Sequence, residues 1–247
     1  MIGRTLSVAA RALRQLQHDH RFLGLSLVAP VLIIYLLKIF FDSVENPLFK
    51  PQQFVVPMGA FIVHFLTYVL CTIVLVRERT AQTLARMFVN GYGRAEIIGG
   101  YLLAYTTLAT AQSALVLTEL NWLFDLKFDA GRFLSMYLVI WLLAVISMAL
   151  GIFVSNFARN EGQVFPFIPL VILPSVFLSG VIVAVEKLPG WAQVLGHLTP
   201  LFYANRLVQA LVPSGGALSQ EMGSLGALPL YGAAVLVLAT FTLREVD

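Results

Sequence analysis

Six long apolar runs constrain this chain more than any other feature of its sequence. A helix needs roughly 20 apolar residues to cross the hydrocarbon core of a membrane, and each run is long enough. Only 12% of the 247 residues are charged, whereas about a quarter are charged in a soluble domain. The sequence therefore predicts an all-α, polytopic membrane protein with six transmembrane helices. The predicted spans are 22–41, 54–76, 97–120, 133–155, 164–185 and 225–243.

Lys and Arg are divided unequally between the two sets of loops. The segments that would share a side with the two termini hold ten of these residues, and the opposite side holds five. Because basic loops stay in the cytoplasm, we expect both termini there, in the inner (cytoplasmic) membrane. The net charge of +3 then reflects topology and not nucleic-acid binding. Cys71 is the single cysteine and lies in the second span, so no disulfide can form within the chain.

Residues 1–21 are expected to form an amphipathic helix on the membrane surface, ahead of a transmembrane domain over 22–247. Arg and His side chains follow one stripe of this helix, and apolar residues recur at steps of four and three on another. One interpretation is a basic anchor for the first span, and a second adds contact with a cytoplasmic partner. The two are compatible. The apolar stripe consists of Ile2, Leu6, Ala9, Leu13 and Leu16.

A basic, polar segment over 76–100 separates the second and third runs. It is long enough for a short cytoplasmic helix, which the sequence Gly91-Tyr92-Gly93 would end. Such an element is typical of a docking site for a soluble partner, so we expect the chain to be the membrane half of a machine. We expect Leu84, Met87 and Phe88 on one side of the segment and Arg79, Gln82 and Arg86 exposed on the other.

Proline interrupts two regions in the second half of the chain. Pro166, Pro169 and Pro174 fall in the fifth predicted span, where each removes a backbone donor and kinks the helix. Such a helix either lines a cavity or moves, or it has kinks that serve packing alone. Residues 188–211 are too apolar for a solvated loop and too interrupted by Pro and Gly to span. They are predicted to form a re-entrant external helical hairpin.

Motifs that carry chemistry are missing from the sequence. No GxxxxGK[ST] loop occurs, so we do not expect the chain to hydrolyse nucleotide. No HExxH or GxSxG occurs either, and we assign no catalytic residue and no metal ligand. No relay of ionisable residues crosses the centre of the spans, as an ion-driven antiporter would usually require. We therefore expect the energy for its work to come from outside the membrane domain.

Aromatic residues of the second and fifth spans are the candidates for a substrate path. Such a stripe is more often helix packing than the wall of a ligand site, and a histidine at this depth can simply bond a neighbouring helix. Both interpretations remain open. The candidates are Phe61, His64, Phe65 and Tyr68 in the second span and Phe165, Phe167 and Phe177 in the fifth.

Three segments together resemble the ABC-2 family of ATP-binding-cassette exporter permeases, in particular the daunorubicin-resistance-like branch that exports drugs and lipids. Residues 11–37 are similar to the basic first helix that runs into a proline-containing span. Residues 77–105 resemble the family's Arg-Glu-x-x-x-Gly-Thr-Leu-Glu segment. Residues 157–211 carry its polar turn, its Leu-Ser-Gly ending, its Leu-Pro-x-Trp start and its Pro-Leu-x-Tyr-Ala-x-x-Leu piece, and are the most specific of the three.

The resemblance implies a partner arrangement and a set of coupling residues. It implies two permease subunits, this chain with a second copy or a homologous permease, and ATPase subunits that bind ATP and magnesium. No cofactor would be held by this chain. The family pattern has Gly where this chain has Gln82, and Glu where it has Ala85. Carried over to matching positions, the residues that couple to the ATPase are Arg77, Glu78, Arg79, Thr83, Leu84, Arg86, Arg159 and Glu161.

These observations predict the transmembrane permease subunit of an ATP-driven exporter for an amphiphilic, drug-like or lipid-like substrate. The loop over 77–94 and the helix over 4–21 would pass the movement of the ATPase to the spans. A polysaccharide or glycolipid exporter subunit is the alternative within the family. Outside it, an ATP-independent carrier and a membrane enzyme that uses His197, Tyr203 and Arg206 are less favoured hypotheses.

Overall fold

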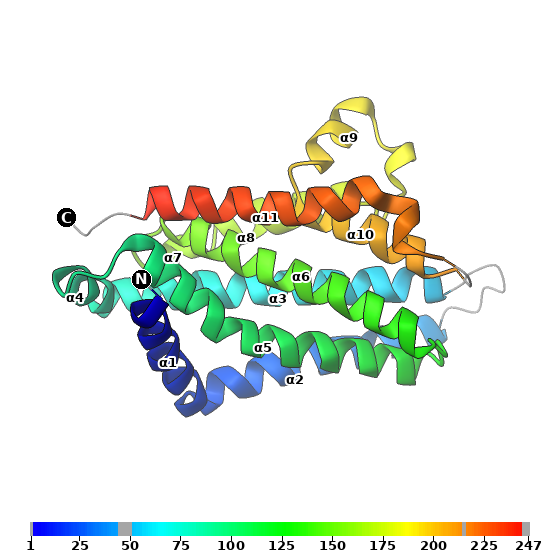
Figure 1. Ribbon diagram of the computed structural model, residues 1–247. Helices are drawn as coiled ribbons and strands as arrows, with labels where there is room; N and C mark the ends of the chain where they lie inside the picture. Colours follow the sequence, from blue (N-terminus) through cyan, green and yellow to red (C-terminus); the bar gives the residue numbers. More distant parts are fainter. Residues whose placement is uncertain (1, 44–50, 214–215, 244–247) are drawn as a thin grey trace.

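The computed structural model describes residues 2–43, 51–213 and 216–243, and all regular structure in them is helical. The chain passes back and forth between two ends of an elongated bundle (Figure 1). The prediction of an all-α polytopic membrane protein is confirmed. The helices at the six predicted spans are α2 (His20–Ser43), α3 (Pro51–Thr80), α5 (Arg94–Leu123), α6 (Ala130–Ser155), α8 (Phe167–Leu178) and α11 (Met222–Thr242).

Five stretches of the described chain are long and apolar enough to cross a membrane. They are His20–Ser43, Gln53–Thr80, Ala130–Ser155, Glu161–Leu178 and Leu218–Thr242. The predicted third span, α5, is not among the five, although its 30 residues extend over about 45 Å. It packs against α1, α2, α3 and α6. Polar side chains such as Tyr101 and Gln112 lower its apolar character, and both are buried against these neighbours.

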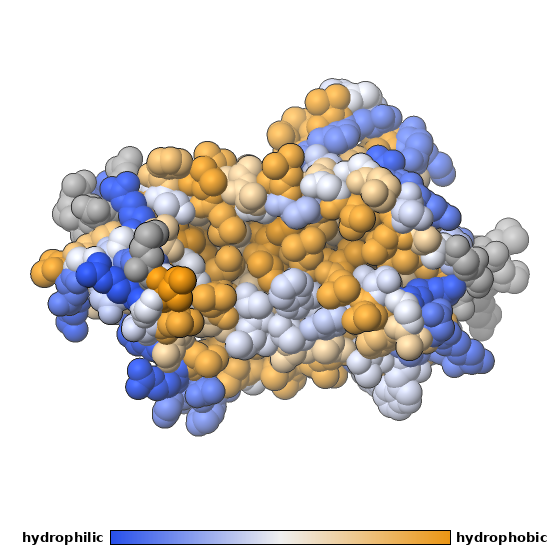
Figure 2. Space-filling model, in the orientation of Figure 1, coloured by the Kyte–Doolittle hydropathy of each residue, from blue (hydrophilic) through white to orange (hydrophobic). Residues whose placement is uncertain are grey.

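An apolar band separates the two ends of the molecule. Figure 2 shows polar side chains gathered at both ends and a wide apolar surface between them. Leu32 of α2, Leu170 of α8 and Phe241 of α11 are among the large apolar side chains exposed along the helices. A continuous apolar surface of this kind is unfavourable in water and suits the hydrocarbon of a bilayer, where only internally satisfied backbone is tolerated.

Helix α6 lies at the centre of the bundle, where it packs against α3, α5, α10 and α11. It approaches α3 closely at Gly151, where a Cβ would lie 2.6 Å from the carbonyl oxygen of Tyr68. A hydrogen bond of 2.7 Å between His64 Nδ1 and Ser147 Oγ joins the same two helices. The absence of a side chain at Gly151 therefore sets the distance between the two most central helices.

The fifth predicted span, 164–185, is shorter and more broken than expected. A four-residue helix, α7 (Glu161–Val164), precedes α8, and the two are separated at Phe165 and Pro166. Helix α8 ends at Leu178, because Gly180 follows in a left-handed conformation with φ of 83°. A glycine just after a helix commonly ends it in this way. The prediction that the helix continues to residue 185 is therefore wrong.

The predicted re-entrant segment forms two helices, α9 (Gly190–Gly196) and α10 (Pro200–Leu211). Helix α10 packs against α3, α6 and α11, with Leu201 and Phe202 among its buried side chains. Helix α9 stands out from the bundle (Figure 1). Two short 3₁₀ turns flank the pair, η1 (Val185–Lys187) and η2 (Leu218–Glu221).

Helix α1 (Ile2–His18) packs across α5. Its buried residues are Val8, Ala12 and Leu16. Gly100 of α5 makes room for this contact, because a Cβ there would lie 2.5 Å from Val8 Cβ. At the start of the predicted apolar stripe, Ile2 and Leu6 are 79% and 55% exposed, whereas Leu16 at its end is buried.

Candidate coupling site at one end of the bundle

A sharp turn after α3 places the short helix α4 (Thr83–Val89) at the same end of the bundle as α1 (Figure 1). Gln82 makes this turn with a positive φ of 60°. Leu84 and Met87 of α4 are buried, whereas Arg86 is exposed. The predicted short helix is therefore present, with the predicted residues on its buried side.

A groove of about 220 Å³ lies between α1 and α4. Thr83 and Arg86, two of the predicted coupling residues, line it from α4. Ser7 and Arg11 line it from α1. The groove is open at the end of the bundle, so a soluble partner can contact both helices there.

Glu78 lies beneath this groove at the end of α3 and is only 2% exposed. Its carboxylate forms an ion pair with Arg11, with Nη2 and Oε2 3.1 Å apart. Arg11 also donates a hydrogen bond to the hydroxyl of Tyr101 on α5. A buried carboxylate is costly without a partner, so this pair fixes α1 to α3 and α5.

Arg79, the next residue, is half-buried, and the prediction that it is exposed is wrong. Its Nη1 donates to the carbonyl oxygens of Ser155 and Ala158, at 2.6 Å each. The last carbonyls of a helix lack partners within the helix, and a cation at this end is favourable. Asn156 continues the contact, because its Nδ2 donates to Ala239 O and Thr242 Oγ1, at 3.0 Å each. Arg79 thus joins the end of α3 to the ends of α6 and α11.

Arg77 connects the two loop segments that the sequence predicted to be near an ATPase. Its Nε lies 3.5 Å from Glu161 Oε1 on α7, and its Nη1 lies 3.5 Å from Asp19 Oδ2 between α1 and α2. All three side chains are partly solvent-accessible, so each pair contributes little to stability. Arg159 is exposed. Sequence analysis missed Arg11 and Asp19 as members of this network, although the basic stripe of α1 contains Arg11.

Comparison with known proteins identifies the family. Residues 4–212 match the family model described as ABC-2 type transporter. This chain belongs to the ABC-2 type transporter family. It is the membrane-embedded part of an ABC transporter, with several helices able to cross the bilayer.

Three curated relatives of this ABC-2 chain are bacterial and amoebal. It is 24% identical to a probable multidrug ABC transporter permease, YbhR, of Escherichia coli strain K12, over 73% of this chain and 49% of that protein. It is 24% identical to ABC transporter G family member 20 of Dictyostelium discoideum, over 69% of this chain and 23% of that one. It is 21% identical to the linearmycin resistance permease protein LnrN of Bacillus subtilis, over 65% of this chain and 41% of that protein. The chain spans about half or less of the length of each.

The candidate substrate-path residues of this ABC-2 chain occupy two environments. Phe61 and Phe65 stack with ring centroids 6.3 Å apart, and the Tyr68 hydroxyl donates to the Phe167 carbonyl at 3.1 Å, which joins α3 to α8. Phe165 and Phe177 are exposed. The seven residues therefore do not line one cavity, and their role in a substrate path stays a prediction.

The residues proposed for a membrane enzyme lie together at the opposite end of the bundle. His197 and Arg206 line one pocket, and the hydroxyl of Tyr203 donates to the His197 carbonyl at 3.0 Å. His197 Nδ1 bonds the Gln193 carbonyl at 2.9 Å and not a nucleophile. No three His, Cys, Asp or Glu residues in the described part of the chain are grouped so that they could hold a metal ion.

Proposed function

We propose that this ABC-2 chain is the permease subunit of an exporter that moves an amphiphilic, drug-like or lipid-like substrate across the cytoplasmic membrane. Separate ATPase subunits bind ATP and Mg²⁺, and a second copy of the chain or a homologous permease completes the transporter. Both termini are cytoplasmic in this arrangement. Two relatives support the substrate class, because their names describe a multidrug permease and a linearmycin resistance permease.

The groove between α1 and α4 carries this proposal. Arg11 lines the groove and also holds the buried carboxylate of Glu78. A partner that enters the groove and moves α1 or α4 therefore acts directly on a charge pair at the end of α3. Arg79 extends the effect to α6 and α11 through the carbonyl of Ser155 and the side chain of Asn156.

The same contacts provide a physical route from ATPase movement to the spans. When the ATPase subunits close, α4 moves relative to α1, and the Arg11–Glu78 pair must shift or separate. Separation leaves the buried carboxylate of Glu78 without its partner, which is costly. Helix α3 therefore moves with α1, and the ion pair stays intact. Because α3 and α6 are packed closely at Gly151, the movement reaches the centre of the bundle.

Cross-linking in native membranes tests the assignment of the groove. A photoreactive cross-linker is attached to the variant Arg86→Cys. The control is the same cross-linker on Ser219→Cys, at the opposite end of the bundle. The native Cys71 is buried and adds little background. We expect the Arg86 position alone to capture a soluble subunit that carries a GxxxxGK[ST] loop. Capture of no such subunit, together with transport that survives ATP depletion and stops when the ion gradient collapses, would support an ion-coupled carrier in its place.

A further inference from the structure

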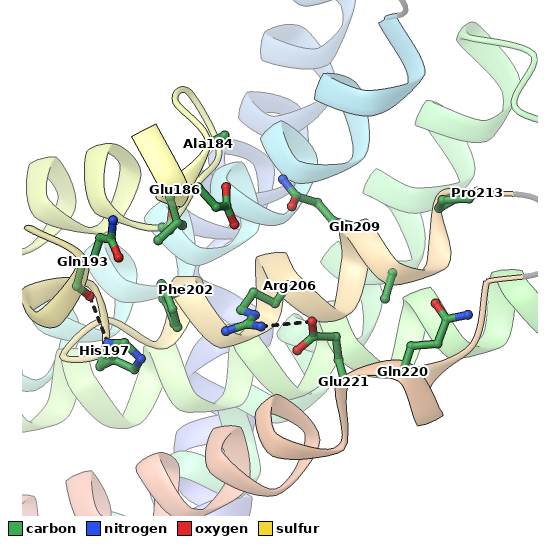
Figure 3. Close-up of a pocket in the computed structure, with 13 residues that line it drawn as sticks. Ala184, Glu186, Gln193, His197, Phe202, Arg206, Gln209, Pro213, Gln220 and Glu221 are labelled. Atoms are coloured by element: carbon green, nitrogen blue, oxygen red, sulfur yellow. Dashed lines mark hydrogen bonds and ion pairs between the residues drawn. The ribbon is translucent and has the colours of Figure 1, made fainter. Parts of the chain in front are cut away.

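A polar pocket of about 540 Å³ lies at the end of the bundle away from α1 and α4. Figure 3 shows that its side chains come from α9, α10 and the turns η1 and η2. It is separate from the coupling groove, and none of the residues assigned to coupling lines it. Contact with an ATPase therefore does not account for this pocket.

The pocket contains more negative than positive charge. Arg206 pairs with Glu221, with Nη2 and Oε1 3.1 Å apart, and its guanidinium lies over the Phe202 ring, 5.8 Å from the centroid. Glu186 also lines the pocket, and no ion pair joins it to another residue in the described part of the chain. Lys187 lines a neighbouring cavity of about 390 Å³ and not this one. The carboxylate of Glu186 is thus available to a cationic ligand.

Several hydrogen-bonding groups surround this carboxylate. The side chains of Gln193, Gln209 and Gln220 line the pocket, and Figure 3 shows Glu186 and Gln209 facing the space beside Arg206. His197 Nδ1 donates to the Gln193 carbonyl at 2.9 Å. In the neutral ring this leaves Nε2 as an acceptor. The pocket therefore offers one anionic group and several amide and imidazole partners.

The outer face of α9 is apolar, in contrast to the pocket beneath it. Trp191 and Val194 of α9 are 67% and 68% exposed, and Leu198, which follows the helix, is 67% exposed. Gln193 and His197 line the pocket. A short helix with one apolar and one polar face, and with an exposed tryptophan, is typical of the boundary between lipid headgroups and hydrocarbon. These features favour a position of the pocket at headgroup depth, with lipid beside α9.

We propose that this pocket binds the headgroup of an amphiphilic amine. The ammonium group pairs with Glu186, the glutamine amides bind neighbouring polar atoms of the headgroup, and the alkyl chain lies in the lipid along α9. This inference rests on the proposed function in one respect, since it names the substrate class of the exporter. Binding itself needs no ATP.

Photolabelling of the full chain in phosphatidylcholine nanodiscs tests the site without ATP. The probes are a photoreactive long-chain primary amine, the alcohol of the same chain length and the corresponding phosphate monoester. We expect the amine to label residues 184–221 preferentially. Glu186→Gln should lower this labelling about five-fold, as expected for loss of one partly exposed charge pair. Lys187→Gln, the matched control, should leave it unchanged.

Three outcomes would overturn the proposal. They are equal labelling of this segment by the amine and the alcohol, stronger labelling by the phosphate, and amine labelling that Glu186→Gln does not alter. The preference for the amine is measured on the unmodified chain, so it stands even if a variant folds poorly. A failure here leaves ATP-driven export intact, whereas failure to capture an ATPase at Arg86 leaves amine binding intact.

Discussion

Gln82 adopts a backbone conformation that residues with a Cβ rarely take. Its φ of 60° and ψ of 16° are left-handed, which costs an L-residue about 1–2 kcal/mol and costs glycine little. The resemblance to exporter permeases already indicated that Gly is usual at this position. The turn from α3 into α4 gives the physical reason, and Gln82 keeps the turn at an energetic cost.

Two substitutions at this position separate strain from side-chain contacts. Gln82→Gly and Gln82→Ala both remove the amide side chain, but only the glycine also removes the Cβ. We expect the glycine variant to be about 1 kcal/mol more stable than the alanine variant, because the strain outweighs the extra freedom of glycine in the unfolded chain. Thermal unfolding of the purified protein in detergent measures the difference. Equal midpoints would show that the turn is not strained.

Gly151 is a second position where one atom decides the packing. Gly151→Ala places a Cβ 2.6 Å from the Tyr68 carbonyl and 2.9 Å from Thr72 Oγ1, so α3 and α6 must separate. We expect a loss of about 1–3 kcal/mol in stability. Gly24→Ala in α2 is the control, because nothing lies within 4 Å of the added atom. The close packing would be disproved by similar thermal midpoints for the two variants.

At the scale of elements, the contact between α1 and α3 depends on one charge pair. Arg11 is reached from the groove, and Glu78 is buried below it. The pair is therefore both accessible to a partner and costly to break. No other described ion pair of the coupling site contains a side chain as buried as Glu78.

Glu78→Gln removes the charge and keeps the shape of the side chain. We expect the ATPase of the reconstituted transporter to remain active while the amount of substrate moved per ATP falls about tenfold. Asp42→Asn is the control, since it breaks an ion pair with Lys38 far from the groove. The exchange of both charges, Arg11→Glu with Glu78→Arg, should restore part of the coupling. Normal transport per ATP by Glu78→Gln would remove Glu78 from the coupling route.

The sequence predicted elements better than the contacts between them. Apolar run length and basic loops determine helices and their ends locally, so α4 and the hairpin of α9 and α10 could be found from the pattern alone. The partners of Arg79 are backbone carbonyls after α6, and no spacing rule connects positions 76 residues apart. The buried face of α1 depends on Gly100, which is even further away in the chain. The premature end of α8 depends on the conformation of Gly180.

At the scale of the whole molecule, the described helices define two unlike ends. Helix α1, helix α4 and the last turn of α11 share one end, and the pocket beneath α9 lies towards the other (Figure 1). Basic residues gather at the first end. A protein with this distribution is oriented by its positive charges, and the proposed coupling and substrate sites then face opposite sides of the membrane.

Single cysteines report this orientation directly. Val89 of α4 and Ser219 of η2 are both exposed, so Val89→Cys and Ser219→Cys place a thiol at each end. The native Cys71 is buried. We expect a membrane-impermeant maleimide to label position 219 in right-side-out vesicles and position 89 only in inverted ones. Parent protein should stay unlabelled in both, until detergent and heat expose Cys71. The reverse pattern would invert the topology and place α4 outside the cell.

The packing of α1 on α5 has a consequence for synthesis in the cell. Helix α1 leaves the ribosome before α5, and Gly100, against which Val8 packs, follows the end of α1 roughly eighty residues later. At about 5–20 residues per second, the face formed by Val8, Ala12 and Leu16 waits roughly 4–16 s for its partner. The exposed arginines of α1 can hold the nascent helix at the lipid surface for that time. The contact of α1 with α5 at the proposed coupling end can therefore form only after α2 and α3 have been made.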